Sequence, residues 1–427
     1  MDLLSIASQT RTAAGMLART TPETRNAALA AMADALAARA DEIRAANEQD
    51  IAAARREGLA APLLHRLSLD DKKIAGLVSG LRSLQSLPDP IGKITVRTEL
   101  SPGLVLERIS CPLGVIGIVF ESRPDAFVQI ASLCLKSGNA CLLKGGREAL
   151  QTNRKLRDVL LDATASVGIP RTWMALLESR DEVQGMLSLD RYIDLIIPRG
   201  SNEFVRQIQA STHIPVLGHS AGICHLYVDT DADAEMAVRI AVDAKTQAPA
   251  TCNSIETLLV HSEIAPAFLP ALKTAMDARS VRLLGDDRTR TVIPCDAATE
   301  SDWDTEYLDT ILSVKIVDSA DEAVRHINRH GSRHTDAIVT ENKSTAETFL
   351  AAVDSADVFW NCSTRFADGY RFGLGAEIGI STGKIHARGP VGLEGIMTYK
   401  WLLRGHGETV APFADGSASF THRPLPL

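Results

Sequence analysis

The spacing of apolar residues changes along the chain and predicts different kinds of structure. Roughly the first ninety residues are alanine-rich with a helical period, and Thr20-Thr-Pro-Glu23 is typical of a helix start, because a hydroxyl can cap free amides and proline suits the first turn. From about residue 95 the pattern alternates, which predicts two strands over residues 93–100 and 104–109, joined by Ser-Pro-Gly. A helical region therefore precedes a strand pair.

Farther along, apolar runs of strand length alternate with helical patterns. The run over residues 114–120 is continuously apolar, as expected of a parallel strand that is buried on both faces. The same alternation predicts further strands at 141–144, 192–197, 224–228, 257–261 and 337–340, and helices at 124–137, 148–167, 201–210 and 317–328. This order is typical of doubly wound α/β domains, whose ligands bind beyond the carboxyl ends of the strands.

Composition narrows the class of protein. The 427 residues are 45% hydrophobic and can bury a large core in two or three domains. The net charge of −8 comes from interspersed acidic and basic residues, which favours a small substrate over nucleic acid. Seven scattered cysteines lack zinc spacing, so we expect reduced thiols and no metal. Without a basic leader or an apolar run of about 18 residues, a cytoplasmic protein with no membrane association is expected.

One of the seven cysteines, Cys252, stands out by its surroundings. It lies in a short polar stretch, residues 245–254, between a helix-like run and the apolar residues 257–261. A thiol at such a break is accessible and can be held as a thiolate by nearby amides or cations, as a covalent nucleophile requires. The alternative is a small residue that fills a gap in the core.

Two turns follow predicted strands and carry candidate cofactor ligands. In Lys144-Gly-Gly-Arg147, the cations could meet a ribose or phosphate while the glycines allow close backbone approach. Arg199-Gly200-Ser201-Asn202 lies at a helix start, where free amides favour an anion. Each turn alone is more often simple turn chemistry, and the glycine fingerprint GxGxxG is absent.

Two later loops concentrate polar side chains. Residues 330–336 bring Ser332, Arg333 and His334 together, which could bind a phosphate or carboxylate, although the default interpretation is a solvated turn. Residues 361–365 and the glycine-rich residues 372–380 form a second polar patch of a kind that is often functional.

These residues resemble the aldehyde dehydrogenase superfamily and, within it, the gamma-glutamyl phosphate reductase (glutamate-5-semialdehyde dehydrogenase) family. The most specific likeness is a long pattern over residues 317–338, which includes His326, His330 and His334. Further segments resemble the same family and occur in the same order along the chain; they are residues 112–117, 121–125, 144–149 and 245–256. The likeness covers nearly the whole chain and implies the superfamily's α/β fold.

The resemblance also implies roles and domains. Cys252 would be the nucleophile, Lys144 and Arg147 would contact the adenosine ribose and 2′-phosphate of NADPH, Gly200 and Ser201 would lie at the cofactor helix, and Glu306 would touch the nicotinamide ribose. Residues 1–220, completed by about 385–395, would bind NADPH; residues 221–384 would form the catalytic domain; and residues 95–110 with 396–427 would form an oligomerisation arm. A homo-oligomer follows, and association with glutamate 5-kinase is a further possibility.

Two departures from the wider superfamily refine the expected chemistry. Hydrolytic aldehyde dehydrogenases have a glutamate base where this chain has Val216, and valine cannot deprotonate water. An Asn-x-Pro motif is replaced by Ser122-Arg-Pro124, so the oxyanion would depend on the Cys252 amide, with Asn253 or Ser122 as weaker donors.

The expected reaction is therefore the reduction of L-glutamyl 5-phosphate to L-glutamate 5-semialdehyde and phosphate by NADPH through a cysteine thioester, the second step of proline biosynthesis. The candidates for binding substrate and leaving phosphate are Ser332, Arg333, His334, Asn361, Ser363 and Arg365. The alternatives are another NAD(P)-dependent dehydrogenase acting on a small aldehyde, and a catalytically dead nucleotide-binding protein.

Overall fold

The chain begins with a layer of helices. The computed structural model describes residues 2–121, 123–200, 202–219 and 221–427, with residues 61 and 62 described by their backbone alone. The helices are α1 (Leu3–Leu17), α2 (Pro22–Ala38), α3 (Ala40–Arg56), α4 (Ala61–Leu67) and α5 (Asp71–Ser86). The cap of α2 is Thr21, whose hydroxyl accepts from the Thr24 amide, one residue later than the sequence pattern predicts. No helix among the described residues has both the length and the apolar character needed to cross a bilayer.

The first parallel sheet has the order β5-β4-β3-β6. Its strands are β3 (Val115–Phe120), β4 (Ala140–Lys144), β5 (Met174–Leu176) and β6 (Leu195–Arg199), with helices α6 (Pro124–Lys136), α7 (Leu150–Ala165), α8 (Arg180–Met186) and α9 (Asn202–Ala210). Every residue of β3 is buried, which explains its unbroken apolar pattern. The helices α6 and α7 pack with α2, α3 and α5, while α1 packs on β4 and joins the same hydrophobic core.

The second sheet is parallel throughout, with the order β10-β9-β11-β8-β7-β12-β13. Its strands are β7 (Cys224–Val228), β8 (Ile255–His261), β9 (Arg282–Gly285), β10 (Asp296–Ala297), β11 (Ile311–Val317), β12 (Thr335–Val339) and β13 (Asp357–Trp360), and its helices are α10 (Ala234–Thr246), α11 (Ala265–Asp277), α12 (Asp287–Val292), α13 (Ala320–His330) and α14 (Lys343–Ala352). The predicted α/β fold is confirmed, and the structure contains two parallel sheets.

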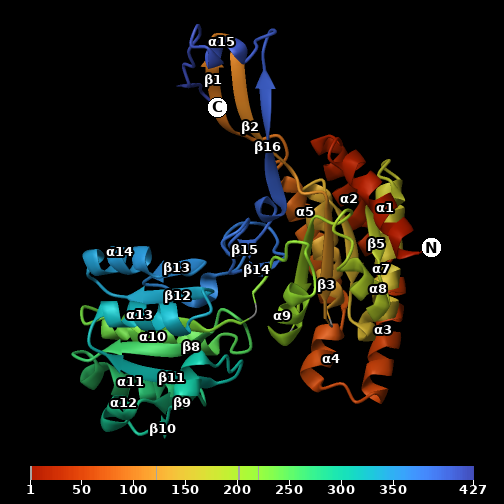
Figure 1. Cartoon of the computed structure of the whole chain (residues 1–427). Helices are drawn as coiled ribbons and strands as arrows, with labels where there is room; N and C mark the ends of the chain where they lie inside the picture. Colours follow the sequence, from red (N-terminus) through yellow and green to blue (C-terminus); the bar gives the residue numbers. More distant parts are fainter. Residues whose placement is uncertain (1, 122, 201, 220) are drawn as a thin grey trace.

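A third, antiparallel sheet projects away from the other two (Figure 1). It has the order β16-β2-β1-β17, from β1 (Ile94–Ser101), β2 (Leu104–Pro112), β16 (Met397–Arg404) and β17 (Arg423–Pro424), with the short helix α15 (Ala411–Ala414). A small pair, β14 (Gly379–Ser381) with β15 (Gly389–Val391), connects the second parallel sheet to this arm. Short 3-10 helices complete the chain at η1 (Arg147–Ala149), η2 (Arg171–Trp173), η3 (Glu300–Asp304), η4 (Thr364–Phe366) and η5 (Glu394–Ile396).

Candidate active site

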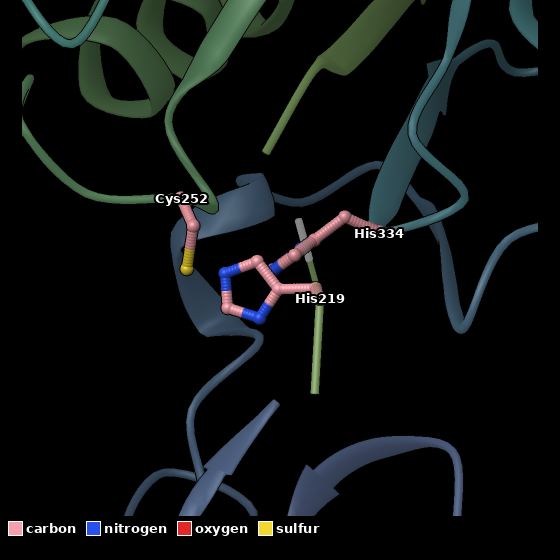
Figure 2. A group of neighbouring side chains, drawn as sticks. All are labelled: His219, Cys252 and His334. Carbon is pink, nitrogen blue, oxygen red and sulfur yellow. The ribbon is translucent and has the colours of Figure 1, made fainter. Parts of the chain in front are cut away.

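Cys252 lies on the loop between α10 and β8, and its side chain is half-buried. The thiol points toward the ring of His219, while His334 reaches toward the same space from the start of β12 (Figure 2). The sulfur and one ring nitrogen of each histidine lie within 4.8 Å of one another. His219 belongs to the segment between the two parallel sheets, so the thiol faces their junction.

Burial controls the charge of this thiol in the free protein. The pKa of Cys252 is raised to about 12, chiefly by removal from water and also by the nearby carboxylates of Glu377 and Glu306, while Arg199 and Arg365 oppose the rise. The sequence predicted a thiolate held by amides or cations. Two cations are present, but burial and the two carboxylates outweigh them, so the thiol is protonated at neutral pH until a ligand changes its surroundings.

The loop that carries the thiol is fixed from both sides. The Asn253 side chain is buried and donates through Nδ2 to the Ala367 carbonyl at 2.8 Å, while the Thr364 hydroxyl donates to the Asn253 carbonyl at 2.7 Å. Asn253 therefore connects the cysteine loop to η4, and its side-chain amide group already donates a hydrogen bond. Its predicted part in oxyanion binding stays a prediction, and Ser122 lies outside the described residues.

A buried ion pair closes the base of the same loop. Lys245 lies in the last turn of α10 and Glu256 is the second residue of β8. The Lys245 Nζ lies 2.5 Å from Glu256 Oε2, and both side chains are fully buried. Burial raises the pKa of Glu256 to about 7, and it lowers the pKa of Lys245. The other carboxylate oxygen of Glu256 accepts from the Leu308 amide at 3.2 Å, so the pair joins the loop to the residues that follow Glu306.

The substitution Lys245→Met is expected to destabilise the protein by about 3–5 kcal/mol, because it leaves the Glu256 carboxyl buried without its partner. Denaturant unfolding measures the change, and the double variant Lys245→Met/Glu256→Leu should recover most of the loss. The surface pair of Lys273 and Asp277 supplies the control, since Lys273→Met should cost at most about 1 kcal/mol. Equal costs at the two lysines would contradict this account of the pair.

Two of the six candidates for binding phosphate lie near the thiol. His334 is fully buried beside Cys252, and Arg365 is close enough to lower the pKa of Cys252 while its Nε donates to Gln247 at 2.8 Å. Asn361 instead bridges the ends of β12 and β13 by bonding both backbone groups of Thr340.

The remaining three candidates have structural partners. The Ser332 hydroxyl accepts from the Ile223 amide at 2.8 Å, and the Ser363 hydroxyl caps η4 by accepting from the Arg365 amide. Arg333 has a left-handed backbone, is 58% exposed, and faces Asp354 at 3.9 Å. The geometry thus separates His334 and Arg365 from the other four candidates.

The cofactor candidates lie at the carboxyl ends of the first sheet, as strand order predicts. Lys144 ends β4 and its ammonium contacts the Gly145 carbonyl, whereas Arg147 is 84% exposed and pairs with Glu57 at 3.2 Å. Gly200 follows β6 immediately before α9, and Ser201 lies outside the described residues.

Glu306 bridges the two halves of the molecule. One carboxylate oxygen accepts from Asn202 in α9 at 2.7 Å, and the other accepts from the Gly222 amide at 2.9 Å. Glu306 therefore lies between the first turn of α9 and the chain segment that leads to β7, near both His219 and Cys252.

A charged cavity shares two charged residues with the surroundings of the thiol. It has a volume of about 510 Å³ and lies between α5, the start of α6 and the loop of residues 368–377. Its charged lining residues are Arg123, Arg199, Asp368 and Glu377. Of these, Arg199 lowers and Glu377 raises the pKa of Cys252. Sequence reasoning missed these residues and His219 as site residues. The only signal was position, since Arg199 ends a predicted strand and Glu377 lies in a glycine-rich loop.

The sequence resemblance places Val216 at the position of the base of hydrolytic aldehyde dehydrogenases. It pairs with Ile196 as an extra parallel bridge beside β6, and its side chain packs against the first core. The position therefore contributes packing and cannot accept a proton from water.

Comparison with known proteins agrees with this arrangement. The family model described as "Aldehyde dehydrogenase family" matches residues 2–295. The gamma-glutamyl phosphate reductase of Pelotomaculum thermopropionicum is 56% identical over 425 residues, covering 100% of this chain and 98% of that protein. The reductase of Acetivibrio thermocellus is 54% identical over the same length, covering 100% of this chain and 99% of that protein. The crystal structure of the Thermotoga maritima reductase aligns with a TM-score of 0.94 at 40% identity, covering 96% of this chain and all of the other. The chain therefore belongs to the aldehyde dehydrogenase family and, within it, to the gamma-glutamyl phosphate reductases.

Proposed function

We propose that this enzyme reduces L-glutamyl 5-phosphate to L-glutamate 5-semialdehyde and inorganic phosphate with NADPH, in the biosynthesis of proline. The observation that carries the proposal is the position of Cys252. Arg199 and Arg365 lower the pKa of its thiol, and Arg199 also lines a cavity with charges of both signs. The resemblance places Val216, which cannot act as a base, at the position of the hydrolytic base. Full-length identity to proteins named gamma-glutamyl phosphate reductase supports the same activity.

The covalent step begins with deprotonation of the thiol. His219 offers a neutral imidazole nitrogen within 4.8 Å of the sulfur and can accept that proton. The sulfur then attacks the C5 carbonyl carbon, and the bond from that carbon to the phosphate oxygen breaks. Inorganic phosphate departs, and the glutamyl group remains bound to Cys252 as a thioester. NADPH, when bound, supplies the hydride that converts the thioester carbon to the aldehyde level. Breaking the C–S bond releases the semialdehyde, and the cysteine sulfur takes up a proton.

The residues near the thiol suit the charges that develop. The Cys252 amide has no hydrogen-bond partner in the described part of the chain, so it can donate to the carbonyl oxygen as that oxygen becomes negative. Arg365 and the neighbouring His334 are our candidates for stabilising the leaving phosphate, with Ser332, Arg333, Asn361 and Ser363 holding the surrounding loops.

The edge of the first sheet suits a nicotinamide dinucleotide, the cofactor type that aldehyde dehydrogenases use. Lys144 and the two glycines after it offer a cation and close backbone approach, and the start of α9 offers the positive end of a helix dipole to a phosphate. We assign the nicotinamide ribose to Glu306, and the 2′-phosphate that distinguishes NADPH from NADH to Arg147, which would leave its exposed pair with Glu57.

The charged cavity suits the amino-acid end of the substrate. An α-carboxylate can pair with Arg123, and an α-ammonium can pair with Glu377 or Asp368, all of which line the cavity. A simple aliphatic aldehyde would leave these charges without partners, so the cavity favours glutamyl over apolar substrates.

The substitution Glu377→Gln is expected to change two measurements in opposite directions. Loss of an ion pair with the substrate ammonium should lower kcat/KM about 10-fold to 100-fold. Removal of the negative charge that raises the pKa of Cys252 should increase its rate of alkylation by iodoacetamide at pH 8. The exposed Glu394, changed to glutamine, is the control for both assays. Slower alkylation of the Glu377→Gln variant would be inconsistent with the proposed charge contact.

The reverse reaction tests the function as a whole. With glutamate 5-semialdehyde and NADP⁺, cofactor reduction should require added phosphate and should saturate as phosphate is titrated from zero. Full activity without phosphate would identify a hydrolytic dehydrogenase and would overturn the proposal. NADPH binding without turnover in either direction would identify a nucleotide-binding protein.

The projecting sheet is our candidate for an oligomer interface. One face of the edge strand β16 carries Tyr399, Trp401 and Leu403, each of which is at least half exposed. A second subunit that packs on this face would remove their apolar surface from water. The variant Trp401→Glu/Leu403→Glu should sediment as a smaller species, whereas Leu4→Glu on α1 should not. An unchanged sedimentation coefficient would exclude this interface. Association with glutamate 5-kinase stays a prediction.

A further inference from the structure

Three potential metal ligands converge at the active site from separate parts of the chain. The sulfur of Cys252 and one ring nitrogen from each of His219 and His334 lie within 4.8 Å of one another (Figure 2). A thiolate with two imidazoles is a typical donor set for Zn²⁺. The sequence shows no zinc spacing because these ligands come from three different segments.

The two histidines are oriented as metal-ligating histidines are. Nδ1 of His219 lies 2.9 Å from the Ile380 carbonyl, to which only a protonated nitrogen can donate, so Nε2 carries the free lone pair. Nδ1 of His334 lies 2.8 Å from the Thr335 hydroxyl, which itself lies 3.4 Å from an Asp357 carboxylate oxygen. Because Thr335 donates to Asp357, it accepts from His334. Such outer partners fix the tautomer of a ligating imidazole.

The unpartnered Nε2 atom of His334 is a second, independent indication that a ligand binds here. Nε2 is fully buried and has no hydrogen-bond partner within the described ranges of the chain. A buried polar atom without a partner costs free energy, and a bound ligand would remove that cost.

We propose that Cys252, His219 and His334 form an inhibitory Zn²⁺ site that blocks the nucleophile of the resting enzyme. When the metal binds, the S–H bond of Cys252 breaks, its proton passes to solvent, and a Zn–S bond forms, while each histidine contributes a nitrogen lone pair and nothing is oxidised or reduced. Water or substrate completes a tetrahedral shell. The proposal rests on the proposed function only for the nucleophilic role of Cys252.

The geometry and charge of the site are compatible with this occupant. Bonds of about 2.0–2.3 Å around a tetrahedral zinc ion place its ligand atoms roughly 3.5 Å apart, so the three side chains need to close by only about 1 Å. The carboxylates of Glu306 and Glu377 face the sulfur and favour a cation, while Arg199 and Arg365 oppose it. Because the same two arginines would attract the acyl phosphate, metal and substrate should compete for the site.

Metal binding to the full-length protein tests the proposal without relying on turnover. Titration of Zn²⁺ against a chromogenic chelator should give one site per chain, and Co²⁺ in place of Zn²⁺ should give a thiolate-to-metal charge-transfer band with the visible spectrum of a tetrahedral ion. Cys252→Ala should abolish that band, and His219→Ala should raise the Kd for Zn²⁺ at least tenfold. His213→Ala, an exposed histidine on the same connecting segment, and Cys295→Ala should bind as the unaltered protein does.

The outcomes separate the metal site from the enzymatic function. Zinc should inhibit the reductase at least tenfold at one equivalent, and a chelator should restore its activity. An unchanged Kd in His219→Ala, with its melting temperature preserved, would reduce the effect to simple thiol capping and would overturn the three-ligand site. An active reductase that shows no charge-transfer band would also overturn it. Cobalt binding to a protein without reductase activity would leave the site intact and refute the proposed function alone.

Discussion

Replacing Cys252 with alanine is expected to lower turnover by at least about 10⁴-fold while the cofactor still binds. Without the thiol there is no thioester, and the remaining groups supply only binding and charge stabilisation. The assay is NADP⁺ reduction with glutamate 5-semialdehyde and saturating phosphate, and NADPH fluorescence measures cofactor binding. Because Cys252 is half-buried and alanine lacks only its sulfur atom, the substitution should leave the fold intact.

The other cysteines provide the matched control. Cys295 directly precedes the edge strand β10, at the opposite side of the second sheet from β12 and β13, so Cys295→Ala should keep activity within about twofold. Turnover of Cys252→Ala above about 1% of the unaltered enzyme would contradict covalent catalysis. Hydride transfer would then have to reach the acyl phosphate directly.

The sequence predicted the strands that are buried on both faces and missed those with weaker patterns. The continuous apolar runs correspond to β3, β4 and β7 within one or two residues at either end. In contrast, β9, β10 and β13 are two to four residues long and lie near the edges of the second sheet, where little apolar pattern is required. The seven-residue β11 (Ile311–Val317) was missed as well, and the predicted helix over residues 317–328 overlaps its last residue.

The candidate site shows the same division between local and distant information. Cys252 could be identified because the break between a helix and a strand is a local feature, and the resemblance supplied its role. His219 and Glu377 could not, because what brings them to the thiol is the packing of two sheets and a loop more than 100 residues beyond Cys252. The charge of the thiol also depends on burial, and no sequence pattern reveals the burial of a single sulfur.

The polar loops illustrate a further limit. Ser332 and Asn361 have the chemistry of anion ligands, yet each already bonds backbone groups of a neighbouring strand or its flank. Short polar side chains serve both purposes, so residue type alone cannot distinguish a ligand from a structural tie. Only the positions of their partners separate these two residues from His334 and Arg365.

The substitution Gly222→Ala is expected to lower kcat by about 100-fold, although glycine has no functional group to lose. A methyl group at Gly222 would lie 2.5 Å from the Cys252 Cα and 2.6 Å from its carbonyl carbon, and closer still to its carbonyl oxygen. Because these are backbone atoms, the collision cannot be relieved by rotating a side chain, and the cysteine loop has to move. A displacement of about 1 Å at a nucleophile can cost 10²-fold in rate.

The neighbouring Gly218 is the control for this effect. A methyl group there would meet Pro198 no closer than 3.6 Å, which is an ordinary contact, so Gly218→Ala should keep kcat within about threefold. The Gly222→Ala variant should also lose some stability, about 1–3 kcal/mol, as overpacked sites do. The decisive comparison is kcat at a temperature where both variants are fully folded by circular dichroism. If Gly222→Ala then turns over as fast as Gly218→Ala, the close contact between Gly222 and the cysteine loop does not position the nucleophile.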